Sequence, residues 1–214
     1  LHDSYHQAAY ILDKFKQVGY SAQSMSYWVF TDIFEEAGPR FTPFHGGFGL
    51  MTIQGIKKPA YHAYAFLNQL GDTELVNTDS ASWVCKNNKG DLQILLWDYS
   101  HTLPDDLNNQ QYYILDLPAK SKGRVSLDMK GIPAGTYHLD TYKIAYAIND
   151  PYTHYARMGR PAQLNRQQVD FLKSQSRGLP IASEWVTVAD DGSLKRELLL
   201  NENDVIMVVM NRMK

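Results

Sequence analysis

One stretch of the sequence decides the fold, Ser26-Tyr27-Trp28-Val29-Phe30-Thr31-Asp32-Ile33-Phe34-Glu35-Glu36. It runs from an apolar, aromatic segment into acidic side chains, and we predict a short strand over residues 24–30. Such a strand suits sugar binding, because an indole ring stacks on the C–H face of a pyranose and carboxylates accept hydrogen bonds from its hydroxyls. The alternative is an ordinary buried strand followed by a solvated loop.

The segments on either side of this stretch predict two amphipathic helices. Upstream, Ser4 and Gln7 have the spacing of a capping box, and apolar residues then recur on one helical face to residue 18. Downstream, the glycine- and proline-rich loop 31–49 is too long for a simple connector, which indicates a functional loop. Pro59 then suits the first turn of a helix over residues 59–70. Helix, strand, loop and helix form an α/β unit, but this unit alone cannot close a fold.

From about residue 74 the pattern changes to short strands separated by turns. Trp83–Lys86 and Asp91–Trp97 flank an Asn88-Lys89-Gly90 turn, which predicts a hairpin. The further strands that we predict are Tyr112–Leu117, Gly123–Asp128, Tyr137–Ile144, Glu184–Ala189, Leu194–Leu200 and Val205–Met210. Strands of this length and number indicate an antiparallel sandwich or barrel.

One insertion interrupts these strands. We interpret Asn149–Pro161 as irregular, and Asn165 with Gln168 predicts a capping box for one short helix that ends near Ser174. The tyrosine-rich stretch Tyr146–Tyr155 is either a contact surface for a neighbouring domain or subunit, or a simple sheet edge.

Composition narrows the class of protein. Of the 214 residues, 44% are hydrophobic and 21% are charged, as in a globular protein, and the net charge of −2 argues against nucleic acid or an anionic membrane as partner. No segment contains the run of about 20 apolar residues that a membrane-spanning helix needs. The single cysteine, Cys85, excludes an internal disulfide and leaves the redox compartment open, with the bacterial cytoplasm and periplasm as the two compartments considered. The histidines lack metal-ligand spacing, so we expect no metal site.

The sequence begins with Leu1 in place of an initiator Met, and its first residues show no signal-peptide pattern. We interpret the chain as part of a longer one, with processing as the alternative.

The opening stretch and its continuation closely resemble the β-xylosidases of glycoside hydrolase family 39. The resemblance rests on Ser26–Glu36, followed by Ala37-Gly38-Pro39, Phe44-His45-Gly46-Gly47-Phe48-Gly49-Leu50 and Gly55-Ile56-Lys57-Lys58-Pro59-Ala60-Tyr61, and later on Met158-Gly159-Arg160-Pro161. It implies an α+β chain in which residues 1–73 are the last helix–strand–helix of a (β/α)8 TIM barrel and residues 74–214 are an antiparallel β-sandwich. It also implies hydrolysis of β-xylosides with retention, without a cofactor.

The resemblance assigns several side chains to sugar binding. Trp28 would be the platform under the glycone sugar, and Glu35 and Glu36 would reach its hydroxyls. Asp32 would join this site or orient the loop, and His45 would face the cleft or pack within the loop. The alternatives are a core role for Trp28 and solvated loop charges for the two glutamates.

The catalytic pair of such an enzyme is missing from this sequence. A retaining glycosidase needs two carboxyl groups ~5–5.5 Å apart across the sugar, and the family carries them as Glu at the ends of earlier barrel strands. The six glutamates here do not match that pattern: Glu35, Glu36, Glu74, Glu184, Glu197 and Glu202. We therefore expect the C-terminal part of an enzyme that releases β-xylose from xylosides and xylo-oligosaccharides, with the catalytic Glu pair upstream and this chain inactive alone.

A non-enzymatic alternative stays open. The strands would then form an accessory, carbohydrate-binding or oligomerisation module, with Trp97 or Trp185 as surface aromatics that bind sugar. We also expect the incomplete barrel to leave unpartnered apolar stripes on helices 4–18 and 59–70, which predicts self-association into a homo-oligomer.

Overall fold

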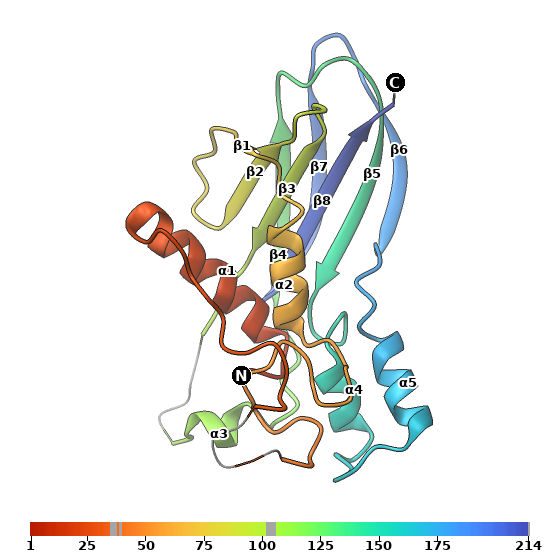
Figure 1. Cartoon of the computed structure of the whole chain (residues 1–214). Helices are drawn as coiled ribbons and strands as arrows, with labels where there is room; N and C mark the ends of the chain where they lie inside the picture. The colour runs from red at the N-terminus through yellow and green to blue at the C-terminus, as the bar shows by residue number, and fades with distance from the viewer. Residues whose placement is uncertain (35–37, 39, 102–105, 214) are drawn as a thin grey trace.

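The computed structural model describes residues 1–34, 38, 40–101 and 106–213, and it contains two antiparallel sheets and several helices (Figure 1). The larger sheet has six strands in the order β1 (Thr73–Glu74), β2 (Ser82–Lys86), β3 (Leu92–Trp97), β8 (Val205–Arg212), β5 (Gly135–Ile144) and β6 (Ala182–Val188). The smaller sheet pairs β4 (Ser121–Met129) with β7 (Leu194–Asn201). The hairpin and the strand predictions in these ranges are confirmed.

The central strands of the large sheet are buried on both faces. Every residue of β3 is buried. Because side chains alternate along a strand, Ile94 joins the core shared with β4 and β7, whereas its neighbour Leu95 joins a second core on the opposite face. This burial explains why β3 is apolar at every position except Gln93 and does not alternate between apolar and polar residues.

The second core is made with α1 (His6–Val18) and α2 (Pro59–Leu67), which lie against this face of the sheet (Figure 1). Leu12 of α1, Phe66 of α2 and Ile144 of β5 all have almost no exposed surface. The expectation of unpartnered helical stripes is therefore wrong, because the sheet and the facing helix cover them. We predicted self-association from those stripes. It stays a prediction, but the stripes no longer support it.

Two predictions at the helix ends are also wrong. The Ser4 hydroxyl donates to Leu1 O and lies 3.1 Å from His6 Nδ1, so it does not cap α1, whose N-cap is Tyr5. Helix α2 starts at Pro59 as predicted but ends at Leu67.

The aromatic segment is extended, yet it does not form the strand predicted over residues 24–30. Val29 N donates to Phe48 O at 3.1 Å, Leu50 N donates to Val29 O at 3.0 Å, and a single parallel bridge joins Thr31 to Met51. Within the described residues, segment 48–51 is the only backbone partner of residues 29–32, and regular strand structure needs a longer ladder.

Residues 112–117 do not form a strand either. The short helix α3 (Asn109–Tyr112) comes first, and the following backbone bonds residues that flank other helices of the chain. The Tyr5 hydroxyl donates to Leu117 O at 2.9 Å, and the Arg160 guanidinium donates to Ile114 O. These carbonyls therefore bond side chains instead of a neighbouring strand.

The insertion between β5 and β6 contains two helices, so the prediction of one short helix is wrong. The capping box of Asn165 and Gln168 is confirmed at the start of α5 (Arg166–Ser174), but α4 (Pro151–Arg157) occupies the stretch predicted to be irregular. Tyr152 and Tyr155 of α4 pack inward against Phe44, and this internal contact accounts for part of the tyrosine-rich stretch. None of the described helices is both long enough and apolar enough to cross a bilayer.

Candidate functional site

The aromatic segment presents the rings of Trp28 and Phe30 on the surface, whereas Tyr27 packs against the second core. The Trp28 side chain is 65% exposed, and the ring of Phe34 meets it edge-on with the centroids 5.4 Å apart. The peptide bond between Trp28 and Val29 is cis. The core role considered for Trp28 therefore does not describe this chain, in which the indole is available to a ligand.

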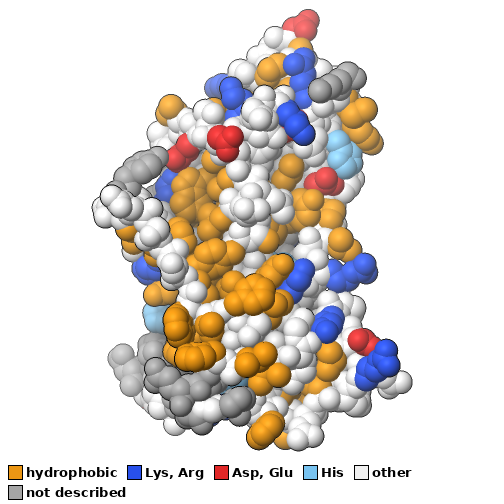
Figure 2. Space-filling view, in the orientation of Figure 1, with side chains coloured by type: hydrophobic (Ala, Val, Ile, Leu, Met, Phe, Trp, Pro, Cys, Tyr) orange, Lys and Arg blue, Asp and Glu red, His pale blue; other side chains and the backbone are white. Residues whose placement is uncertain are grey.

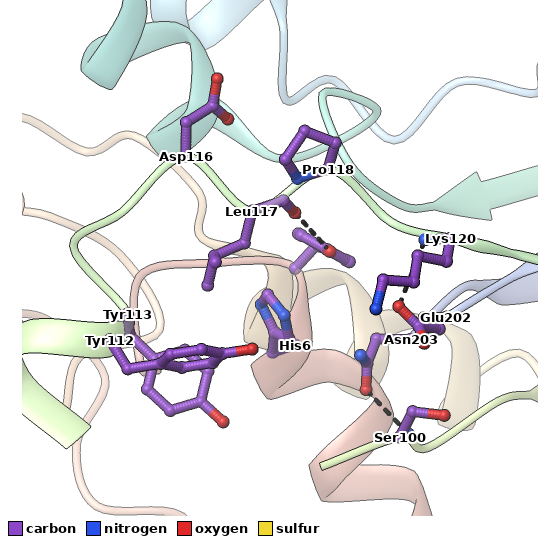
Figure 3. A pocket seen from close by; sticks show the side chains of 11 residues that line it. His6, Ser100, Tyr112, Tyr113, Asp116, Leu117, Pro118, Lys120, Glu202 and Asn203 are labelled. Atoms are coloured by element: carbon purple, nitrogen blue, oxygen red, sulfur yellow. Dashed lines mark hydrogen bonds between the residues drawn. The ribbon is translucent and has the colours of Figure 1, made fainter. Parts of the chain in front are cut away.

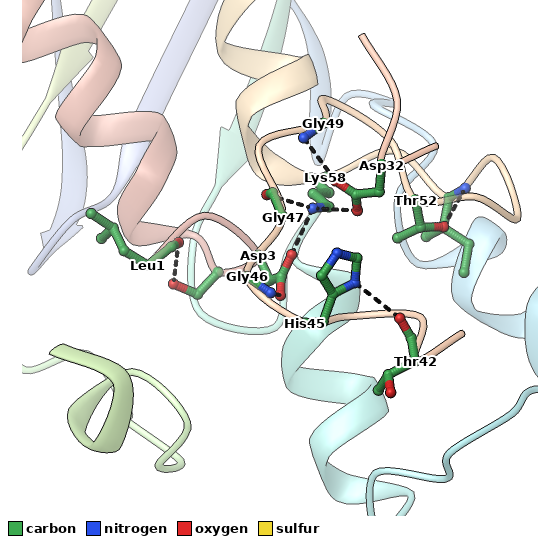
Figure 4. Close-up of polar contacts among 12 residues, drawn as sticks. Leu1, Asp3, Asp32, Thr42, His45, Gly46, Gly47, Gly49, Thr52 and Lys58 are labelled. Atoms are coloured by element: carbon green, nitrogen blue, oxygen red, sulfur yellow. Dashed lines mark hydrogen bonds and ion pairs between the residues drawn. The ribbon is translucent and has the colours of Figure 1, made fainter. Parts of the chain in front are cut away.

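A buried ion cluster fixes the loops around this segment (Figure 4). Lys58 has no exposed surface, and its Nζ lies 2.6 Å from Asp32 Oδ2 and 2.7 Å from Asp3 Oδ1. The ammonium also donates to the carbonyl oxygen of Gly47 at 3.1 Å. One cation thus joins the start of the chain, the end of the aromatic segment and the glycine-rich loop.

The two carboxylates also hold the backbone of that loop. Asp3 Oδ2 accepts a hydrogen bond from Gly46 N at 2.6 Å, and Asp32 Oδ1 accepts one from Gly49 N at 2.7 Å. A Cβ on Gly49 would lie 2.4 Å from Asp32 N, so only glycine allows this close approach. The structure therefore gives Asp32, which is fully buried, the loop-orienting role that the sequence left as one of two options.

The charges in this cluster are strongly coupled. Burial disfavours the Lys58 ammonium, but the two carboxylates outweigh that penalty and hold the pKa of Lys58 above its usual value. Burial raises the pKa of Asp32, and the Lys58 ammonium and the hydrogen bond from Gly49 oppose this shift. With one cation for two carboxylates, the cluster depends on Lys58 remaining charged.

Sequence analysis missed Lys58 and Asp3 as members of this site. Neither shows in a hydrophobic pattern, and Asp3 precedes the first helix as an ordinary polar residue. Lys58 does fall within the Gly55–Tyr61 stretch that carried the resemblance. Its place directly before Pro59, in the first turn of α2, was the signal that could have identified it as a site residue.

His45 packs within its loop, and its position in a sugar cleft stays a prediction. Its Nδ1 lies 3.0 Å from the carbonyl oxygen of Thr42 within the loop, and the half-buried ring also lines a cavity of about 520 Å³. The cavity lining includes Asp3, Phe48 and Tyr113, but not Trp28. Glu35 and Glu36 lie outside the described residues, so a sugar site shared by Trp28 and these glutamates stays a prediction.

The glutamates that the structure describes are all tied to the sheets and their flanks. Glu74 lies 3.3 Å from Lys16 Nζ, and Glu202 accepts a hydrogen bond from Lys120 N at 3.2 Å. The other two form ion pairs between strands, Glu184 with Arg196 and Glu197 with Arg124. In the described ranges, no three His, Cys, Asp or Glu side chains are grouped as metal ligands.

The two tryptophans of the accessory-module alternative lie in different environments. Trp97 is only 2% exposed, and its ring packs at 4.8 Å from that of Trp83 in the second core. Its proposed role as a surface aromatic is therefore wrong. Trp185, on strand β6, is 59% exposed and has His138 beside it at 4.6 Å.

Comparison with known proteins finds two beta-xylosidases that are similar to this chain. The chain is 29% identical over its full length to a beta-xylosidase from Geobacillus stearothermophilus, and 31% identical over 192 residues, 86% of the chain, to a beta-xylosidase from Caldicellulosiruptor saccharolyticus. It spans 39% and 36% of the length of these two relatives.

Solved structures show the same relationship. A GH39 enzyme from Xanthomonas axonopodis pv. citri is 38% identical, with a TM-score of 0.94 over 99% of this chain and 42% of the enzyme. A monomeric beta-xylosidase from Caulobacter crescentus CB15 is 31% identical, with a TM-score of 0.93 over 100% of this chain and 42% of that protein. The family model of glycosyl hydrolases family 39 matches residues 1–194. The chain therefore belongs to glycosyl hydrolases family 39, as its resemblance indicated.

Proposed function

We propose that this chain is the C-terminal part of a retaining glycoside hydrolase that releases β-xylose from xylosides and xylo-oligosaccharides. Residues 1–73 would form the last helix–strand–helix of a (β/α)8 barrel, and residues 74–214 the sandwich domain. Two observations support this division: the chain spans about two-fifths of its relatives, and the sheet begins at β1, at Thr73.

The observation that carries the proposal is the exposed Trp28 on a segment held by the buried Lys58 cluster. A fixed indole at the surface is a suitable platform for a pyranose ring. Glu35 and Glu36 follow on the same loop and would bind the sugar hydroxyls. The catalytic acid/base and nucleophile would lie upstream, and no cofactor is needed for double displacement.

The apolar surface around Trp28 also supports the proposal that residues 1–73 are one segment of a larger barrel. Large hydrophobic side chains of residues 28–48 are exposed: Trp28, Phe30, Ile33, Phe34, Phe41 and Phe48. Figure 2 shows hydrophobic side chains gathered over the helical part of the molecule. A contiguous apolar surface marks an interaction site, and in the complete enzyme the upstream barrel elements would cover part of it.

The test is the kinetics of a chain extended upstream through the whole barrel. Trp28→Ala should lower kcat/KM for an aryl β-xyloside by about tenfold or more, because ring stacking is lost in the transition state as well as in the ground state. Trp185→Ala, which removes an equally exposed indole from β6, is the matched control and should leave kcat/KM unchanged. Equal kinetics for Trp28→Ala and the parent would contradict the glycone-platform role.

The accessory-module function remains the second candidate because Trp185 is exposed on the sheet. It predicts that Trp185→Ala, and not Trp28→Ala, weakens binding of the 214-residue chain to xylan. A pull-down with insoluble xylan distinguishes the two candidates.

A further inference from the structure

A second cavity lies at the junction of the helices and the sheets (Figure 3). Its volume is about 370 Å³, within the range of small-molecule sites. Its walls come from the start of α1, the segment 112–120 and the turn between β7 and β8, so segments far apart in the sequence form it together. Trp28 does not line it.

One wall of the cavity is aromatic and uncharged. The rings of Tyr112 and Tyr113 meet edge-to-face at 5.1 Å, and the Tyr113 hydroxyl is fixed by His101 Nδ1 at 2.8 Å. His6 packs 5.2 Å from Tyr113, and burial lowers the pKa of His6 to about 3, so its imidazole stays neutral. Ring faces without charge suit the C–H surface of a sugar.

The opposite wall is polar and held in place. Asn203 is buried: its backbone N donates to Asp98 Oδ2 at 3.0 Å, and its Oδ1 accepts from Ser100 N at 3.1 Å. Lys120 N donates to Glu202 Oε2 at 3.2 Å, which fixes that carboxylate. Figure 3 shows the Lys120 ammonium and the Asn203 amide nitrogen on the cavity side. Among the described residues, no hydrogen bond or ion pair of the protein engages either nitrogen.

We propose that this cavity binds one neutral pyranose ring. The Lys120 ammonium and the Asn203 amide would donate to ring hydroxyls, the Glu202 carboxylate would accept from one, and Tyr112 would stack on the ring. The carboxylates of Glu202 and Asp116 beside a single cation disfavour phosphate and other anions. That the ring is a xylose unit rests on the proposed function.

The experiment is an NMR chemical-shift titration of the 214-residue chain with xylotriose. Tyr112→Ala and Lys120→Met should each raise Kd at least about tenfold, whereas Tyr112→Phe, which keeps the ring, should change it by less than about threefold. Trp28→Ala should leave the affinity for this site unchanged. Thermal unfolding of each variant confirms that the fold is intact, and Lys120, on the surface, provides a variant that leaves the core untouched.

The outcomes separate this proposal from the proposed function, because the readout needs no turnover. Unchanged affinity in Tyr112→Ala and Lys120→Met, or no saturable binding at all, would overturn the cavity assignment even if the longer chain hydrolyses xylosides. Loss of binding in Trp28→Ala alone would place the sugar at the aromatic segment instead. Inorganic phosphate that binds in this cavity more tightly than xylotriose would overturn the neutral-sugar assignment.

Discussion

At the scale of single residues, Lys58 is the side chain on which the candidate site depends most. Its ammonium joins Asp3 and Asp32, both buried, and through them the loop that borders the aromatic segment. Removing one partner of a buried ion pair leaves an uncompensated charge and costs far more than removing a surface charge.

We predict that Lys58→Met destabilises the chain by about 3–5 kcal/mol, because two buried carboxylates lose the cation that pairs with both of them. Urea denaturation at neutral pH measures the change in the free energy of unfolding. Lys57→Met is the control: the Lys57 ammonium lies 4.6 Å from the centre of the Tyr61 ring, and its loss should cost about 1 kcal/mol or less. Equal costs for the two variants would contradict the role given to the cluster.

A second residue-scale prediction concerns pH. Asp150 is fully buried at the start of α4, and burial raises its pKa to about 7, although hydrogen bonds from Thr153 Oγ1 at 2.5 Å and Ala147 N at 3.3 Å oppose this. Its pKa in the unfolded chain is about 3.9. The folded state therefore binds this proton more tightly, and Asp150 makes stability fall as pH rises from about 4 to about 7.

We therefore predict that the stability of Asp150→Asn relative to the parent chain increases by about 2–3 kcal/mol as the pH rises from 5 to 8. The measurement is urea denaturation of both chains at the two pH values. Asp170→Asn, on the exposed side of α5, controls for the loss of one negative charge. If the free energy of unfolding changes by the same amount between the two pH values in Asp150→Asn and in the parent chain, the buried carboxyl is not the group that titrates.

At the scale of elements, the docking of α1 on the sheet is the feature that sequence reading did not anticipate. Leu12 has no exposed surface and packs between α2 and the sheet. We predict that Leu12→Ala costs about 2–5 kcal/mol in the free energy of unfolding, since it removes methyl groups and leaves a cavity. Val18→Ala, at the half-exposed end of α1, should cost about 1 kcal/mol or less. A small effect for Leu12→Ala would show that α1 is not held by this core.

The elements also show what the sequence could and could not predict. The hairpin of β2 and β3 was predictable because its two short apolar runs and the Asn-Lys-Gly turn between them are local signals. Residues 24–30 and 112–117 have equally strong β-forming side chains, but their backbones bond a single loop or distant side chains. Strand formation depends on a partner, and the local sequence does not specify that partner.

The candidate site shows the same limit. Trp28 could be predicted as a candidate because an aromatic residue in a family-like stretch is a local signal, and its sugar-binding role stays a prediction. The cluster of Lys58, Asp3 and Asp32 is a tertiary contact among three separate segments, so no spacing rule could predict it. The pairing of α1 with the sheet is likewise a property of the folded chain.

At the scale of the whole molecule, the chain packs one core on each face of its larger sheet, and we propose that it contributes sugar-binding groups to an enzyme whose catalytic pair lies upstream. The two cores and the family membership are shown, whereas the absence of a catalytic pair is an expectation that rests on the sequence positions of the six glutamates. Activity should therefore belong only to a chain that includes the upstream barrel.

The most direct measurement is hydrolysis of an aryl β-xyloside by this 214-residue chain beside a chain extended upstream through the whole barrel. We predict that only the longer chain turns over the substrate. Release of the aryl group by the shorter chain at a comparable rate would contradict the account, because Glu35 and Glu36 or an assembled oligomer would then supply the chemistry.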